Sequence, residues 1–217
     1  MIFSLTFATI RNQGVICARG AGFRWHFFAG AGQVRRTSMS LAYKFRKAEG
    51  LLEKIESGDR NELLRICHRI RDAQEALLAA AGEQMERCIN RCEGICCRNI
   101  ELDPIISHWD LLYILSLAPQ IRPHILVCLL NEDPLYRTDC IFLTDGMGPC
   151  IFPAKIRPEV CVATFCQNDR SIRREIQQVK RLFIRLSWFV RWSILRTKLR
   201  KLKKAVTAAF SRMHNTS

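Results

Sequence analysis

Eleven cysteines, eight of them gathered in two groups, constrain this chain of 217 residues more than any other feature. A disulfide scaffold is typical of secreted domains too small to build a core, whereas this chain is long enough to bury one. Its first ten residues are apolar but lack the basic region and the cleavage site of a secretory signal. In a reducing compartment, grouped thiolates favour ligation of zinc or an iron–sulfur centre. The predicted ligands are Cys88, Cys92, Cys96, Cys97, Cys140, Cys150, Cys161 and Cys166.

The spacing of the first cysteine group allows two geometries. If a helix continues through it, Cys88, Cys92 and Cys96 stand at i, i+4 and i+8, which places successive thiols on one face about 6 Å apart. Gly94 weakens a helix there, so a loop that folds back on the ion is an equal alternative. Cys97 points away from Cys96 in either case, so the two adjacent thiols serve different metals, or one of them is structural.

Three further residues are possible ligands, but the sequence favours other roles for them. Cys67 lies on the apolar stripe of a predicted helix, and Cys128 lies in a second predicted buried helix, so both are interpreted as core residues. His108 is close to the first cysteine group in the sequence, but we expect it to face solvent in the first turn of a helix. No local pattern indicates serine or cysteine catalysis, so the catalytic residues stay unknown.

The two groups resemble the YkgJ-like cysteine-cluster family, which is described as a zinc- or iron-chelating domain. The likeness spans about residues 86–167, although the common pattern of that family spaces the first group by two residues rather than three. One relative with a similar cluster is a flagellin lysine N-methylase, so the resemblance also implies a methyltransferase as an alternative. No glycine-rich loop after a predicted strand would hold S-adenosylmethionine in the usual way. The residues that carry the resemblance are Cys88, Cys92, Cys96-Cys97, the Phe-Leu pair after Cys140, Cys150 and Arg157-Pro158 before Cys161.

The remaining pattern is mainly helical. Apolar residues at helical spacing predict one helix over 41–56, interrupted by Gly50, and Asp59 predicts the N-cap of a second helix that runs to about Cys88. Ser107 and Asp110 have the form of a capping box before the apolar run 111–117, and 124–130 predicts a buried helix. Two short strands joined by a glycine-rich turn are predicted from Cys140 onward.

The net charge of +14 is concentrated in one arm. Residues 170–204 hold thirteen Lys or Arg and a single acid, Glu175, while residues 1–38 hold five Arg and no acid. The centre is therefore mildly acidic, which does not match the charged face of a DNA-binding domain. We therefore expect residues 170–204, the basic arm, to bind any partner that is attracted by positive charge.

A long amphipathic helix is predicted for residues 171–204, with two apolar rows. One row starts at Ile172 and ends at Val190, and the other starts at Trp188 and ends at Leu202. Arg185 and Arg191 interrupt its most apolar stretch, which is too short to cross a membrane. Three interpretations remain: a helix packed on the cysteine domain, a helix in an anionic membrane surface, and, as the least favoured, a nucleic-acid contact.

We therefore predict a mainly α fold with a small irregular cysteine-rich metal-binding element and little β structure. Residues 1–38 are an extension outside the fold, interpreted as upstream sequence from a misassigned start codon, with a mitochondrial transit peptide as the alternative. The segments 39–87, 88–169 and 170–217 are the N-terminal helices, the cysteine-cluster domain and the basic helix with its tail. The predicted function is a cytoplasmic metal-binding protein, peripheral to a membrane, in a structural or redox role.

Overall fold

The computed structural model describes residues 40–82, 101–130, 140–144, 150–153, 155–164 and 170–214. Every regular element in these ranges is helical, so the mainly α prediction is confirmed. In place of the two predicted strands, these residues contain an isolated antiparallel bridge between Leu143 and Cys150. The extension 1–38 lies outside the described residues. The elements are α1 (Leu41–Lys54), α2 (Ser57–Ala80), α4 (His108–Leu117), η2 (Pro119–Ile121), α5 (Arg122–Leu130), α6 (Glu159–Ala163), η4 (Arg170–Ile172) and α7 (Arg173–His214).

Helix α1 is anchored at its start by residues from a distant segment. The Ser40 hydroxyl accepts a hydrogen bond from the Tyr43 N–H, and the Asp103 carboxylate accepts one from the Leu41 N–H at 2.7 Å. Lys44 is nearly buried and donates to the carbonyl oxygens of Asp103 and Ile106. These bonds satisfy first-turn donors and hold α1 against the chain that leads into α4. The helix continues through Gly50.

Helix α2 begins two residues before the predicted cap. Glu56 is the N-cap residue, and Asp59 lies inside the first turn, so the prediction of Asp59 as N-cap was wrong. The reason is tertiary: the Asp59 carboxylate accepts hydrogen bonds from Ser193 and Arg196 of α7. An acidic side chain in this position still interacts favourably with the positive end of the helix dipole.

The C-terminal end of α2 also differs from the prediction. The helix ends at Ala80, eight residues before Cys88, and Ala81 is its C-cap. Ala81 is a turn residue, and Gly82 after it is again helical. The predicted stripe is buried at Leu63, Cys67, Ile70 and Leu77, whereas Leu64 is exposed.

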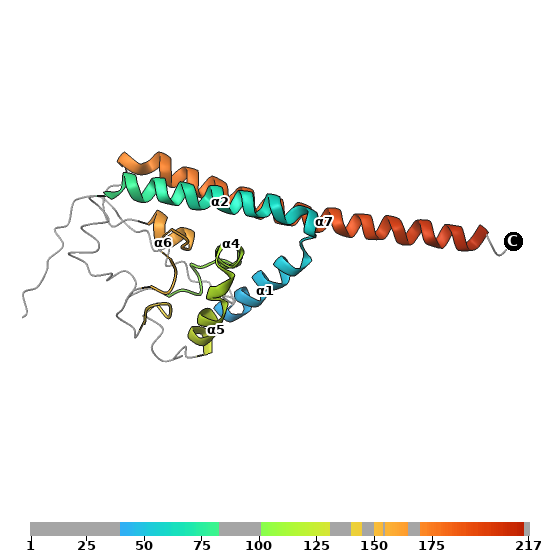
Figure 1. Ribbon diagram of the computed structural model, residues 1–217, viewed down its shortest axis with the longest axis horizontal. Coiled ribbons are helices and arrows are strands. Elements are labelled where there is room, and N and C mark those ends of the chain that lie inside the picture. The colour runs from blue at the N-terminus through green and yellow to red at the C-terminus, as the bar shows by residue number, and fades with distance from the viewer. Residues whose placement is uncertain are drawn as a thin grey trace, which may run out of the picture. The chain divides into compact units, whose positions relative to one another are not determined.

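Helices α2 and α7 lie side by side and antiparallel (Figure 1). Their direction follows from the ion pairs, because Glu56 and Asp59 at the start of α2 bind Arg200 and Arg196 far along α7. The first apolar row of the arm is buried, mainly against α2, which agrees with the packed alternative for its first half but places the N-terminal helix α2, rather than the cysteine domain alone, as the main partner. Removing each such side chain from water contributes roughly 1.5–3 kcal/mol. The buried members of the row are Ile172, Ile176, Val179, Phe183, Leu186 and Val190.

In helix α4 the consecutive residues from Leu111 to Leu115 are all buried in the core. The predicted capping box is confirmed, with Ser107 as N-cap and Asp110 at the third helical position. Its Tyr113 ring meets Phe183 of α7 edge-on at 5.3 Å between ring centroids. Helix α5 was predicted to be buried, which was wrong for most of its length, because Ile125 alone is fully buried there while Val127 and Leu130 are exposed.

Candidate functional site

Three of the eight predicted metal ligands lie in the described residues. Cys140 is buried, Cys150 is half-buried and Cys161 is exposed on α6. The bridge at Leu143 brings the segments of Cys140 and Cys150 together, and the Ile151 N–H donates to the Phe142 carbonyl at 2.9 Å. The other five predicted ligands, which are Cys88, Cys92, Cys96, Cys97 and Cys166, lie outside the described residues.

A pair of aromatic rings holds these two cysteine segments against the core. Phe142 and Phe152 are both buried, and their ring centroids are 4.6 Å apart. Aromatic pairs at this separation contribute about 0.5–1.5 kcal/mol beyond their buried area. The backbone on either side of the bridge is therefore fixed by apolar packing, which gives Cys140 and Cys150 a defined setting.

Cys128, interpreted from the sequence as a core residue, is instead half-buried at the edge of the core. Burial raises the pKa of its thiol, and the negative charge of an ionised Cys150 raises that pKa further. Burial also raises the pKa of Cys150, while the Phe152 backbone N–H and the Arg157 charge act in the opposite direction. Cys128 and Cys150 are therefore within electrostatic reach of each other, a proximity that no spacing rule in the sequence indicates.

The segment that leads to Cys161 is held by a buried glutamine. Gln74 of α2 is fully buried; its Nε2 donates to the Arg157 carbonyl at 2.8 Å, and its Oε1 accepts from the Arg157 N–H at 3.3 Å. The Tyr113 hydroxyl donates to the same Oε1 at 3.3 Å. The Gln74 amide thus pairs with the backbone of Arg157 as a neighbouring strand would, and it satisfies both the N–H and the C=O of that residue.

Asp110 holds the start of α6 in a similar way. Its carboxylate accepts hydrogen bonds from the N–H and the hydroxyl of Ser107, at 2.8 and 2.6 Å, and from the Glu159 N–H at 2.7 Å. Burial raises the pKa of Asp110, and the three hydrogen bonds oppose that rise. One carboxylate therefore caps α4 and also fixes the first residue of α6, two positions before Cys161. The sequence predicted the first role and missed the second.

Neither Cys67 nor His108 has the properties of a ligand. Cys67 is fully buried, and burial raises the pKa of its thiol to about 12, as expected of a core residue. His108 was expected to face solvent but is half-buried against Trp109, with ring centroids 4.3 Å apart. Burial, together with the charges of Lys47, Arg191 and Lys44, lowers the pKa of His108 to about 4. A cationic neighbourhood of this kind disfavours a metal ion.

Within the described ranges, no group of three or more His, Cys, Asp or Glu side chains has a geometry that could hold a metal ion. A site that uses Cys140, Cys150 or Cys161 therefore needs ligands from beyond these ranges. The predicted partners in the first cysteine group are the obvious source. The grouping of all eight thiols stays a prediction.

A second candidate site is the exposed face of α7. The second predicted apolar row faces solvent here rather than the core, with Trp188 68% and Trp192 60% exposed. Intervals of four and three residues keep these side chains on one side of the helix. We define the exposed stripe as Ile184, Trp188, Trp192, Leu195, Leu199, Leu202 and Val206.

The edges of the exposed stripe are basic. Arg185, Lys198 and Lys203 are exposed beside it, and α7 contains no acid after Glu175. From residue 198 to residue 208 every side chain is exposed, so no described part of the molecule covers this end of the helix. An apolar stripe of this length on a solvent-facing helix usually marks an interaction surface.

None of the described helices is by itself both long and apolar enough to span a membrane. A bent pair, His108–Leu117 with Pro119–Leu130, reaches that length and composition only across an angle of 115°.

Comparison with known proteins gives no relative: no family model, no curated protein and no solved structure matches this chain. The resemblance to the YkgJ-like family stays a prediction from the two cysteine groups.

Proposed function

We propose that this chain is a cytoplasmic metal-binding protein that holds zinc or an iron–sulfur centre through cysteine thiolates, in a structural or redox role. The observation that supports it best is the antiparallel bridge between Leu143 and Cys150, which brings the segments of Cys140 and Cys150 together. Cys128 of α5 and Cys150 both pack at the edge of the core.

The acid–base properties of these thiols fit coordination. Burial raises the pKa of Cys128 and of Cys150, so both are protonated at neutral pH before metal binds. A bound cation replaces those protons and compensates the buried negative charge, so binding releases protons. The Arg157 charge favours the thiolate of Cys150, and the Arg157 Nε is buried with no acceptor among the described residues. An anionic thiolate centre beside it would use this donor.

Metal analysis of anaerobically purified protein tests this proposal. We expect stoichiometric zinc or iron, with a visible spectrum that dithionite bleaches if the centre is an iron–sulfur cluster. Cys150→Ser should lower the metal content and the midpoint of thermal unfolding together, because binding and folding free energies are linked. Cys67→Ala is the matched control and should keep the metal, since Cys67 lies in the core. A fully folded protein without metal contradicts the proposal.

Two further measurements place the centre more closely. Cys128→Ser tests whether the Cys128 thiol is a metal ligand. An unchanged metal content would show that Cys128 only packs against the core. The alternative function, a metal-dependent methyltransferase, predicts that the purified protein binds S-adenosylmethionine. Calorimetric titration with that compound separates the enzyme from the binding protein.

A second function, attachment to an anionic membrane surface, is favoured by the exposed stripe. Tryptophan at the level of lipid headgroups, with Lys and Arg beside it, is typical of helices that lie in the membrane interface. A second copy of α7 is a poor alternative occupant, because its basic edges would face the basic edges of the first copy. The basic edges therefore favour an anionic partner, and the exposed stripe favours a partner with a hydrocarbon interior, such as a membrane.

Vesicle sedimentation tests the attachment. The chain should bind vesicles that contain phosphatidylserine, bind neutral vesicles much less, and dissociate as salt rises, because exposed charges are screened within about 10 Å at 0.1 M ionic strength. Trp188→Ser with Trp192→Ser should abolish binding. The matched control, Val127→Ser with Leu130→Ser, removes two exposed apolar side chains from α5 and should leave binding intact. Equal binding to neutral and anionic vesicles would contradict this function.

A further inference from the structure

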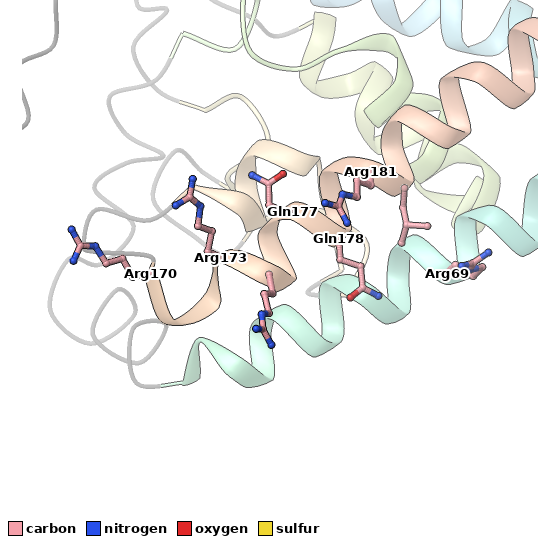
Figure 2. Close-up of a pocket in the computed structure, with 8 residues that line it drawn as sticks. Arg69, Arg170, Arg173, Gln177, Gln178 and Arg181 are labelled. Atoms are coloured by element: carbon pink, nitrogen blue, oxygen red, sulfur yellow. The ribbon is translucent and has the colours of Figure 1, made fainter.

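Arginines of α2, of η4 and of the first turns of α7 line an open cleft (Figure 2). Arg69 enters it from α2, while Arg173, Arg174 and Arg181 enter it from α7. Gln177 and Gln178 add neutral amide donors, and Arg170 of η4 extends the lining at one end. The cleft has a volume of about 830 Å³. It therefore combines the size of a small-ligand site with a strongly positive lining.

No described residue that lines this cleft carries a carboxylate. Arg69, Arg173, Arg174 and Arg181 form no ion pair with any described acid, and Glu175, which follows Arg174 in the sequence, is not part of the lining. The other end of the same helix pair is different, because Arg196 binds Asp59 and Arg200 binds Glu56 there. Among the described residues, these four arginines therefore differ from Arg196 and Arg200 in having no acidic partner.

The arrangement of the arginines defines the ligand further. Arg173, Gln177 and Arg181 follow one another at intervals of four residues, so they share one face of α7. Arg173 and Arg181 are eight residues apart, which is about 12 Å along a helix. A single small anion cannot bind to both, whereas a ligand with several anionic groups can. The start of α7 adds the positive end of the helix dipole to the same region.

We propose that this cleft binds a compact polyphosphate, a small molecule that carries two or more phosphate groups. The planar guanidinium group presents paired donors that match phosphate oxygens, and several such groups side by side are stabilised by a multiply charged anion. Among the described residues, the lining contains no aromatic ring to stack on a nucleobase and one apolar residue, Leu182. These features favour phosphates on a small polar ring, as in an inositol polyphosphate, either free or as a lipid headgroup.

This inference depends neither on the cysteine centre nor on the exposed stripe. The cleft is formed by described residues of α2, η4 and α7 alone. Its failure and the failure of the functions proposed above are therefore separable: metal content, binding to phosphatidylserine vesicles and binding of a soluble phosphate compound are three different measurements.

Calorimetric titration of the full chain with soluble inositol trisphosphate tests the proposal. Arg69→Gln, Arg173→Gln and Arg181→Gln together should weaken binding by about tenfold or more for each arginine lost, since each charge-assisted hydrogen bond contributes at least this much. Arg46→Gln, Lys54→Gln and Arg60→Gln remove the same charge from exposed positions outside the cleft and the exposed stripe and should retain the affinity. Thermal unfolding of both variants should match the parent chain, because all six side chains are exposed.

Vesicles then distinguish the two sources of the phosphates. If the ligand is a lipid headgroup, vesicles with phosphatidylinositol bisphosphate should bind better than phosphatidylserine vesicles of equal charge, and the cleft variant should lose that preference. If the ligand is free, only the soluble compound should show the loss. No binding of inositol trisphosphate, an equal loss in the cleft and control variants, or tighter binding of single-stranded RNA through the same arginines would overturn the proposal.

Discussion

The α2–α7 pair and the cysteine-bearing segments 140–144, 150–153 and 155–164 are held in place by different forces. The helix pair buries a continuous apolar row, and its polar contacts lie at one end. The cysteine-bearing segments contain a single bridge and the short helix α6, and they depend on buried polar side chains from elsewhere, namely Gln74 and Asp110. Periodic structure is stabilised by many equivalent contacts, whereas irregular structure depends on a few specific ones.

The largest effect should come from the helix pair. Leu186 is a fully buried member of the apolar row, and Leu186→Ala leaves a cavity that costs about 2–5 kcal/mol of unfolding free energy. Denaturant unfolding followed by circular dichroism measures the loss. Ile184→Ala is the control two positions away, and its exposed side chain should cost little. Similar losses for the two variants would mean that the row does not hold the pair together.

A smaller effect is expected in the irregular region. Asp110→Ala removes one half of the capping box of α4 and leaves the Ser107 and Glu159 N–H groups without their acceptor, at a cost of about 2–3 kcal/mol. Asp110→Ala should also speed hydrogen exchange at the Glu159 N–H, because the start of α6 opens locally. Leu186→Ala should lower the free energy of global unfolding without speeding this local opening. An unchanged exchange rate at Glu159 would show that the start of α6 is fixed by other contacts and would remove the contrast between the two regions.

The smallest effect concerns the polar end of the helix pair and depends on pH. The Ser193 hydrogen bond, followed by the contacts with Arg196, lowers the pKa of Asp59 below its ordinary 3.8, against an opposing effect of burial. A lowered pKa in the folded state contributes stability above the unfolded pKa, and this stability is lost as the pH falls through the folded pKa. Asp59→Asn should therefore cost about 1 kcal/mol at pH 7, since the pair is partly exposed.

The pH dependence supplies the control for that variant. The stabilities of the parent chain and of Asp59→Asn should converge once the pH falls below the lowered folded-state pKa of Asp59, where the carboxyl group is protonated in both the folded and unfolded states. Asp110 and Glu159, whose pKa values are raised by burial, titrate in both proteins and cancel in the comparison. A difference that persists at low pH would show that the hydrogen bond from Ser193, rather than the charge of Asp59, carries the effect.

The sequence by itself determined the helices and the two apolar rows of the arm, because amphipathic periodicity and capping residues are local properties of a chain. It predicted the capping box of Ser107 and Asp110 and the burial of Cys67, whereas it left open what the row from Ile172 to Val190 packs against. Where a residue contacts a distant segment, local rules failed. Asp59 was predicted as a cap because the pattern of side chains fits one, but α7 provides its partners.

Only the tertiary structure decided which elements meet. It placed Cys128 near Cys150, linked Gln74 to Arg157, exposed the second row of α7, and gathered Arg69 with arginines a hundred residues later in one cleft. These contacts join positions that no periodicity relates, and each is fixed by the packing of whole helices against one another. A sequence pattern specifies the faces of an element, whereas the partner of each face is selected by the burial that the complete fold achieves.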